Sequence, residues 1–138
     1  MYVFSLSLSL NVFILYVFID KSIKRIEKYN KADIKILVDG EEKQAQASGD
    51  GPIDSVFKAI SEAVQIFPVL DSYSVSSITG GMDAQGEVTV TIKDDDISAR
   101  GKGSSTDVII ASARALINAL NNLRWRKNHP KVNNPKGV

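Results

Sequence analysis

Two glycine-rich stretches of this 138-residue chain hold the residue types from which phosphate-binding loops are built. "ASGDGPID" occupies residues 47–54, and "ARGKGSSTD" occupies residues 99–107. A phosphate loop presents backbone N–H groups at a helix start, usually beside a basic side chain. The first stretch has two aspartates and no lysine, and the second has Lys102 without the spacing of a nucleotide-binding loop. We therefore predict no nucleotide site, and we expect the glycines to permit positive φ or close backbone contact where a strand becomes a helix.

Other catalytic chemistry has little support in the sequence. Cysteine is absent, which excludes disulfides, thiolate catalysis and zinc–cysteine sites. The one histidine, His129, lies in a basic tail, so neither a Ser-His-Asp triad nor a multi-histidine metal centre is expected. The acidic run at residues 94–96 is typical of a solvated hairpin tip. We predict no catalytic residue, no metal site and, from the net charge of +1, no nucleic-acid partner.

The first nineteen residues, "MYVFSLSLSLNVFILYVFI", differ from the rest because they are apolar and uncharged. Three interpretations compete: a short transmembrane span, an uncleaved export signal, or a non-native leader from a truncated or misplaced start. A span would place Lys21, Lys24 and Arg25 on the cytoplasmic side. The interspersed serines lower the hydrophobicity of such a span, and no positively charged segment precedes it as an export signal would require. The stretch "FSLSLSL" also alternates as a half-buried strand does. We do not expect a membrane partner, and a membrane anchor stays the minor alternative to a cytoplasmic protein.

Regular elements are predicted from residue 32 onward. Ile34, Ile36 and Val38 share one face of a hairpin that turns at Asp39–Gly40 and returns over residues 43–47. An amphipathic helix follows, with Pro52 at its first position and Asp50 or Gly51 as cap, and it ends near Pro68. Its apolar stripe comprises Ile53, Val56, Phe57, Ile60, Val64 and Phe67.

The second half repeats this order. "SYSVSSIT" and "GEVTVTI" are predicted strands, "KDDD" is a turn and "ISARG" is a returning strand. A long helix then spans "STDVIIASARALINALNNL", with caps from Ser105, Thr106 or Asp107. Both glycine-rich stretches lead from a strand through G-x-G and an aspartate into an apolar helix. We therefore predict an α+β fold of two strand-rich units, ββα and βββα, each closed by one helix on one side of its sheet and related by a pseudo-twofold axis.

Three motifs, in this order, resemble one family: "GDGPIDSVFKAI", "YSVSSITGGMDAQGEVTV" and "GKGSSTDVIIASARALINALNNL". They are similar to the C-terminal regulatory domain of 2-isopropylmalate synthase, the first committed enzyme of leucine biosynthesis. The resemblance covers residues 34–123. Citramalate synthase carries a related domain, but "DAQGEV" and "NALNNL" favour the leucine enzyme.

The resemblance implies a pseudo-twofold domain that dimerises with a second chain and binds the end-product amino acid between the regulatory domains. Binding lowers activity in a separate barrel domain, which holds the divalent metal and joins acetyl-CoA to 2-oxoisovalerate. No part of that barrel is present in this sequence, so we expect no catalysis by this polypeptide alone and no cofactor. The implied partners are leucine or isoleucine, a second copy and the catalytic barrel.

A leucine zwitterion needs partners for its two charges and an apolar pocket. The helix start at Gly51 offers free N–H groups to the carboxylate, and Asp54 or Asp83 would take the ammonium. The resemblance places contacts at the G-x-G-P stretch, at "VLDSY" and at "DAQG", and any side chain at Gly51 is predicted both to strain the turn and to intrude on the effector. For Leu70 and Tyr73, ordinary core packing is the alternative. The candidate effector residues are Gly49, Gly51, Pro52, Ile53, Asp54, Leu70, Tyr73, Asp83, Ala84 and Gln85.

Three segments follow from these patterns: residues 1–31 as an apolar leader and basic linker outside the family, residues 32–124 as the regulatory domain, and residues 125–138 as a basic flexible tail. The chain is then a fragment, a free-standing regulator or a wrongly started reading frame, of which we favour the fragment. Alternative functions are an isoleucine-binding domain of citramalate synthase, a dimerisation module without a ligand, and a membrane-tethered sensor.

Overall fold

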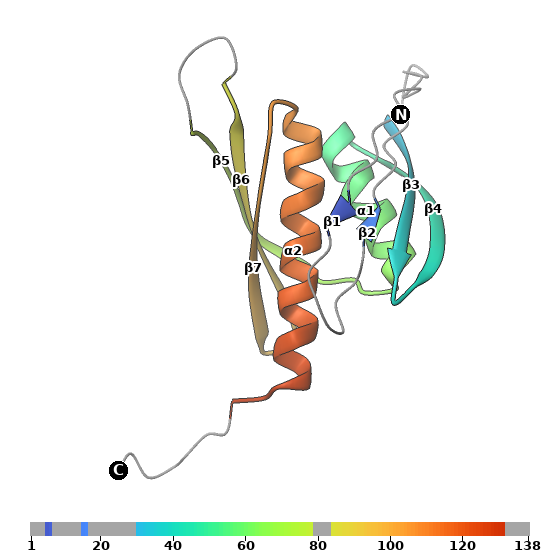
Figure 1. Cartoon of the computed structure of the whole chain (residues 1–138), viewed down its shortest axis with the longest axis vertical. Coiled ribbons are helices and arrows are strands. Elements are labelled where there is room, and N and C mark those ends of the chain that lie inside the picture. Colours follow the sequence, from blue (N-terminus) through green and yellow to red (C-terminus); the bar gives the residue numbers. More distant parts are fainter. Residues whose placement is uncertain (1–4, 7–14, 17–29, 79–83, 132–138) are drawn as a thin grey trace.

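The computed structural model describes residues 5–6, 15–16, 30–78 and 84–131, which form an α+β fold (Figure 1). Two short strands, β1 (Ser5–Leu6) and β2 (Leu15–Tyr16), pair with each other. The first unit contains β3 (Asn30–Val38), β4 (Glu41–Gly49) and α1 (Pro52–Val64). The second contains β5 (Val69–Ser77), β6 (Gly86–Asp94), β7 (Ile97–Ser105) and α2 (Val108–Asn128). The predicted class and the ββα and βββα units are confirmed.

The first unit is an antiparallel hairpin covered by α1. Ile34 and Ile36 are each 1% exposed, as the alternating pattern predicts, and the turn uses positive φ at Asp39 and Gly40. Helix α1 ends at Val64, before the predicted end near Pro68, because the next residue takes a left-handed conformation. A residue before proline disfavours the helical region, so Phe67 lies outside the helix and is 62% exposed. Its placement in the apolar stripe was wrong.

In the second unit, β6 lies between β5 and β7, and α2 packs on β6 and β7. The helix comes close to β7 because Gly101 and Gly103 carry no side chain. A Cβ atom at Gly101 would lie 2.2 Å from the carbonyl oxygen of Ala115, and one at Gly103 would lie 2.3 Å from that of Ala111. Both glycines lie within β7 rather than at the corner between the strand and the helix. The predicted equivalence of the two G-x-G stretches is wrong, since the second corner follows Ser105 and is capped by Asp107, whose Oδ1 accepts from the N–H of Ile109 at 2.8 Å.

Side chains of α2 also cover the free edge of β7. The donors follow one another at every fourth helical position, and the acceptors are carbonyl groups at every second strand position. Because four helical residues rise about 6 Å and two strand residues about 6.6 Å, the two spacings match over the length of both elements. The pairs are Arg114 with Ser104, Asn118 with Lys102, Asn122 with Arg100, and Arg126 with Ser98.

The two helices contact each other, and each has its own sheet on its other side (Figure 1). Both helices begin at the upper end in this view, as do the end of β5 and the start of β6, whereas both hairpin turns lie at the lower end. The core therefore fills the space between the sheets. Its buried apolar residues include Ile34, Ile36, Val56, Ile60, Val88, Val90, Ile92, Leu116, Ile117, Leu120 and Leu123.

The ends of the chain give two further findings. Helix α2 continues to Asn128, so the first residues of the predicted tail are helical, and His129 stacks on Trp125 with ring centroids 4.6 Å apart. Most of the leader at residues 1–31 lies outside the described residues. In the part of the chain that the structure describes, no helix is both long and apolar enough to cross a membrane.

Candidate functional site

The start of α1 is built by the G-x-G-P stretch. Gly49 ends β4, Gly51 is the N-cap residue and Pro52 is the first helical residue. No side chain caps this end; the first bond is from the Ser55 N–H to the carbonyl oxygen of Gly51, at 3.0 Å. The earlier N–H groups of a helix have no acceptor within it, and they carry the positive end of its dipole. This end of α1 therefore offers hydrogen-bond donors to a carboxylate.

Gly49 and Gly51 have different roles. A Cβ atom at Gly49 would lie 2.3 Å from Oδ2 of Asp54 and 2.7 Å from the backbone nitrogen of Ser55, so only glycine lets β4 meet α1 this closely. At Gly51 a Cβ atom would meet nothing within 4 Å, and the φ of −152° is an extended conformation open to any residue. The predicted strain of a side chain at Gly51 is therefore wrong, whereas its predicted intrusion on an effector remains a prediction.

Asp54 already has two partners in its own chain. Its Oδ2 accepts from Nζ of Lys58 at 2.7 Å and from the backbone N–H of Asp50 at 2.9 Å. The bond from Lys58, followed by that from the Asp50 N–H, lowers the pKa of the Asp54 carboxyl below its ordinary value. A bound ammonium group would therefore share this carboxylate with Lys58 rather than meet it free.

Tyr73 connects β5 with both helices. Its ring meets that of Phe57 edge-on, with centroids 6.3 Å apart, and its hydroxyl lies 2.9 Å from Oγ of Ser112. Ser112 donates its single hydroxyl proton to the carbonyl oxygen of Val108 at 2.6 Å. Tyr73 is therefore the donor to Ser112, and its own oxygen keeps lone pairs with which to accept a hydrogen bond. The residue is half-buried and takes part in core packing, as its alternative interpretation held.

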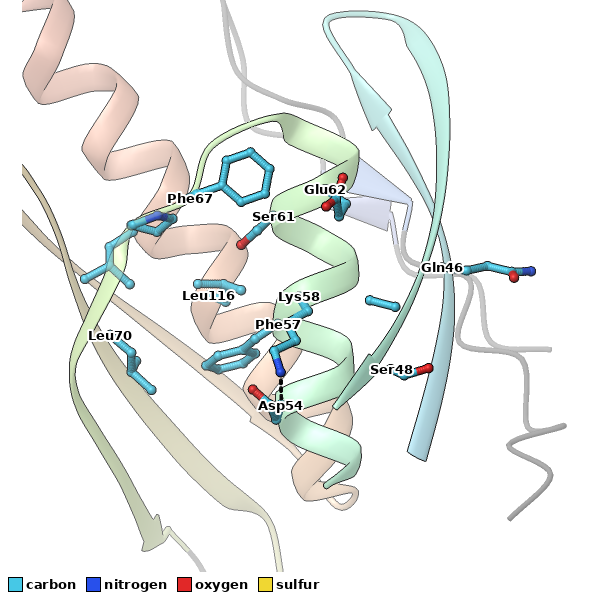
Figure 2. A pocket seen from close by; sticks show the side chains of 13 residues that line it. Gln46, Ser48, Asp54, Phe57, Lys58, Ser61, Glu62, Phe67, Leu70 and Leu116 are labelled. Atoms are coloured by element: carbon cyan, nitrogen blue, oxygen red, sulfur yellow. Dashed lines mark hydrogen bonds and ion pairs between the residues drawn. The ribbon is translucent and has the colours of Figure 1, made fainter. Parts of the chain in front are cut away.

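A cleft of about 590 Å³ lies along the outer face of α1, between β4 and the start of β5 (Figure 2). Two of the predicted effector residues, Asp54 and Leu70, line it, and Leu70 is 47% exposed rather than core. Phe57 and Leu116 contribute apolar surface to it. Sequence reasoning missed Lys58 and Glu62, which also line it. Asp54, Lys58 and Glu62 follow one another at intervals of four, and this spacing is the signal that would have placed all three on one helical face.

Ala84 and Gln85 of the predicted "DAQG" stretch are not among the described residues that line this cleft. Ala84 and Gln85 are exposed just before β6, where the carbonyl oxygen of Gln85 accepts from the N–H of Ile78 at 3.1 Å. Asp83 lies outside the described residues. The end of β5, the start of β6 and the start of α1 share the upper end of the molecule in Figure 1. No group of three or more acidic or histidine side chains suited to a metal ion occurs in the described ranges.

Comparison with known proteins decides the family. The model of the LeuA allosteric (dimerisation) domain matches residues 15–124. The chain belongs to this family. The family match begins at residue 15, within the segment 1–31 that was expected to lie outside it. The predicted resemblance to the regulatory domain of 2-isopropylmalate synthase is confirmed.

Relatives of this LeuA-type domain are themselves named 2-isopropylmalate synthase. That of Nitratidesulfovibrio vulgaris is 55% identical over 92 residues, which cover 67% of this chain and 18% of the relative. That of Nitrosococcus oceani is 46% identical over 103 residues (73% and 20%), and that of Neisseria meningitidis serogroup B is 40% identical over 102 residues (74% and 20%). The chain thus matches about a fifth of the length of these curated relatives.

Proposed function

We propose that this domain binds leucine and thereby carries feedback inhibition to a 2-isopropylmalate synthase, within a cytoplasmic homodimer. The observation that supports this most is the match of residues 15–124 to an allosteric domain, together with 55% identity to a 2-isopropylmalate synthase. The regulated step is the condensation of acetyl-CoA with 2-oxoisovalerate, performed by a catalytic barrel that the matched residues do not include. Leucine is the end product of that route, which makes it the natural inhibitor.

The residues around the start of α1 have the chemistry that a free amino acid requires. The uncapped N–H groups after Gly51 suit the carboxylate, because they are donors at the positive end of a helix. The Tyr73 oxygen and the Asp54 carboxylate are acceptors for the ammonium. Ile53 and Leu70, which are half-buried and exposed respectively, provide apolar surface for a branched side chain. We assign Ala84, Gln85 and Asp83 to the same site from the family resemblance.

Calorimetric titration of the 138-residue chain with leucine, isoleucine and valine tests the proposal. We expect leucine to bind most tightly, with a rise in the melting temperature, since a ligand that binds only the folded state stabilises it. Tighter binding of isoleucine would instead assign the domain to a citramalate synthase. A dimer that gives no heat and no thermal shift with any of the three would be a structural module, and the effector proposal would fail.

Gly51→Ala separates binding from folding. A methyl group there meets no atom of the folded chain, so the variant should melt within a few degrees of the wild type. The same methyl group projects at the helix start, and we expect it to weaken leucine binding about tenfold. Gly40→Asn is the matched control, because Gly40 lies in the β3–β4 turn at the opposite end, with a φ of +85° that asparagine tolerates. Equal leucine affinity in both variants would place the effector elsewhere.

A further inference from the structure

The exposed apolar side chains of the domain are concentrated on one strand and its flanks. Of the seven large apolar residues that are exposed in the described ranges, five lie between residues 67 and 78. We name this group the β5 surface: Phe67, Val69, Leu70, Val75 and Ile78, which are 47–68% exposed. A concentration of exposed apolar side chains is typical of an interaction site in soluble proteins.

Part of the β5 surface belongs to the face of the sheet that carries the core. Leu70 lies opposite Ile92, and Val75 lies opposite Val88, and both partners on β6 are at most 1% exposed. The difference arises because α2 packs over β6 and β7, whereas its side-chain hydrogen bond to β5 is made through Tyr73 and Ser112. The apolar core is therefore not covered over β5, although Leu70 and Val75 there lie on the same face of the sheet as the buried residues of β6.

The two outer edges of this sheet also differ. Four side chains of α2 bond to the carbonyl groups of β7 and cover that edge, whereas β6 is the only described strand that pairs with β5. The uncovered side of β5 continues into the cleft along α1, whose lining includes Phe67 and Leu70 (Figure 2). A partner that fills the cleft would consequently cover part of the β5 surface as well.

The charges on the α1 side of the cleft identify the partner. Asp54, Lys58 and Glu62 follow one another at intervals of four and line the cleft as a row of negative, positive and negative groups. Lys58 pairs with Asp54 at 2.7 Å, and Glu62 forms no ion pair with any described residue. Such a row is self-complementary. When two copies of α1 lie antiparallel about a twofold axis midway between positions 58 and 62, each Lys58 faces the partner's Glu62. Ser61, near that axis, is small enough to let the helices approach.

We propose that the partner in the cleft is a second copy of this chain, with α1 packed antiparallel on α1, reciprocal Lys58–Glu62 pairs across the twofold axis, and the two β5 surfaces buried beside them. The inference rests on the homodimer of the proposed function and assigns its contact surface and register. The effector elements of the two copies would then lie next to the interface, because Asp54 and Leu70 line the same cleft.

Sedimentation equilibrium of the full chain and of its charge variants tests the register. Lys58→Glu places two glutamates against each other at both contacts, and Glu62→Lys places two lysines there, so each variant should weaken the dimer at least tenfold. The double variant, K58E with E62K, restores opposite charges and should dimerise within about threefold of the wild type. Equimolar mixing of the two single variants should form a heterodimer, since every contact then joins a glutamate and a lysine. Leu70→Ser should also weaken the wild-type dimer, because it removes apolar surface from the interface.

Controls separate this interface from a folding defect and from the proposed function. Lys102→Glu reverses an exposed lysine on β7 that also pairs with a carboxylate, Glu87, at 3.0 Å, and it should leave the dimer unchanged. Circular dichroism checks that each variant is folded, and rescue on mixing cannot arise from a local defect. A wild-type dimer that neither single charge variant weakens would overturn the register and leave the proposed function standing. A dimer sensitive to Leu70→Ser alone would indicate pairing along the β5 edge and would likewise overturn it. A monomeric wild type would contradict the homodimer itself.

Discussion

Arg124 of α2 binds both carboxylate oxygens of Asp39, which lies in the turn between β3 and β4. Nη1 is 2.9 Å from Oδ1 and Nη2 is 2.8 Å from Oδ2, so the guanidinium makes a two-point contact across 85 positions of sequence. The pair joins the hairpin of the first unit to the helix of the second at the lower end of the molecule. Two-point arginine–carboxylate contacts have the geometry for which an exposed ion pair contributes measurable stability.

Asp39→Asn should reduce the free energy of unfolding at pH 7 by about 0.5–1 kcal/mol, measured by urea denaturation. Asparagine tolerates the positive φ of 51° at this position, so the change removes the charge and leaves the turn conformation available. Asp95→Asn is the control, because Asp95 has a φ of 52° in the β6–β7 turn and no ion pair with a described residue. The control should change the free energy by less than about 0.5 kcal/mol.

The same pair predicts a dependence on pH. The bond from Arg124 holds the pKa of the Asp39 carboxyl below its ordinary value of about 3.9. The stabilisation is therefore fully present well above this ordinary pKa, and it is lost as pH falls through that value towards the lower pKa of the folded state. Wild type and Asp39→Asn should differ at pH 7 and converge in acid. A difference that persists unchanged well below the folded-state pKa would contradict the assignment.

Gly103→Ala should destabilise the domain by about 3 kcal/mol, because the new methyl group overlaps the backbone of α2 at Ala111 and Ala115. Gly86→Ala provides the comparison, since its Cβ would meet the nearest atom at an ordinary 3.9 Å. Thermal unfolding of the two variants measures the difference. Equal melting temperatures would show that α2 does not approach β7 as described.

Tyr73→Phe should cost about 1 kcal/mol, because the hydrogen bond to Ser112 is lost while the ring contact with Phe57 is kept. A double-mutant cycle with Ser112→Ala isolates the bond. We expect a coupling energy of about 1 kcal/mol from chemical denaturation of the four proteins. A coupling near zero would mean that the two hydroxyl groups do not interact.

Thr91→Val should stabilise the protein by about 1 kcal/mol. The Oγ1 atom of Thr91 is buried without a hydrogen-bond partner among the described residues, and the residue is 9% exposed. A methyl group in its place avoids the cost of an unsatisfied hydroxyl. Thr89→Val, two positions away on the same strand and only half-buried, should alter the free energy of unfolding by less than 0.5 kcal/mol in either direction. Loss of stability in the first variant would reveal a partner for Thr91.

Sequence patterns predicted the elements well where local rules determine them. The alternation through Ile34 and Ile36 gave the buried face of β3, and Asp107 caps α2 as its residue type suggests. The end of α1 was misplaced because a left-handed glutamine, Gln65, ends the helix without the usual glycine. The two glycine pairs look equivalent in sequence, but they differ in the structure. Gly101 and Gly103 lie within β7 and let α2 approach, whereas Gly49 and Gly51 lie where β4 leads into α1.

The candidate site was harder to predict, because its geometry depends on contacts between distant segments. No side chain caps the start of α1, as the predicted carboxylate site requires, but the role of these residues in binding stays a prediction. The bond from the Asp50 N–H to Asp54 could not be read from the sequence. Likewise, the role of Tyr73 depends on Ser112, which lies 39 positions away. Spacing within one helix would have revealed Lys58 and Glu62, since helical neighbours recur at four.

The bonds between α2 and β7 restrict how the second unit can move. Four side-chain donors of α2 are spaced to match four carbonyl groups of β7, so a small sliding of the helix along the strand would break all four hydrogen bonds at once. The next position in which donors and carbonyl groups line up again lies two strand residues further along β7. Gradual sliding of α2 along β7 is therefore unfavourable, and the helix and the strand behave as one rigid unit. A movement of one half against the other that keeps these bonds would turn about the short link after α1, between Gln65 and Pro68.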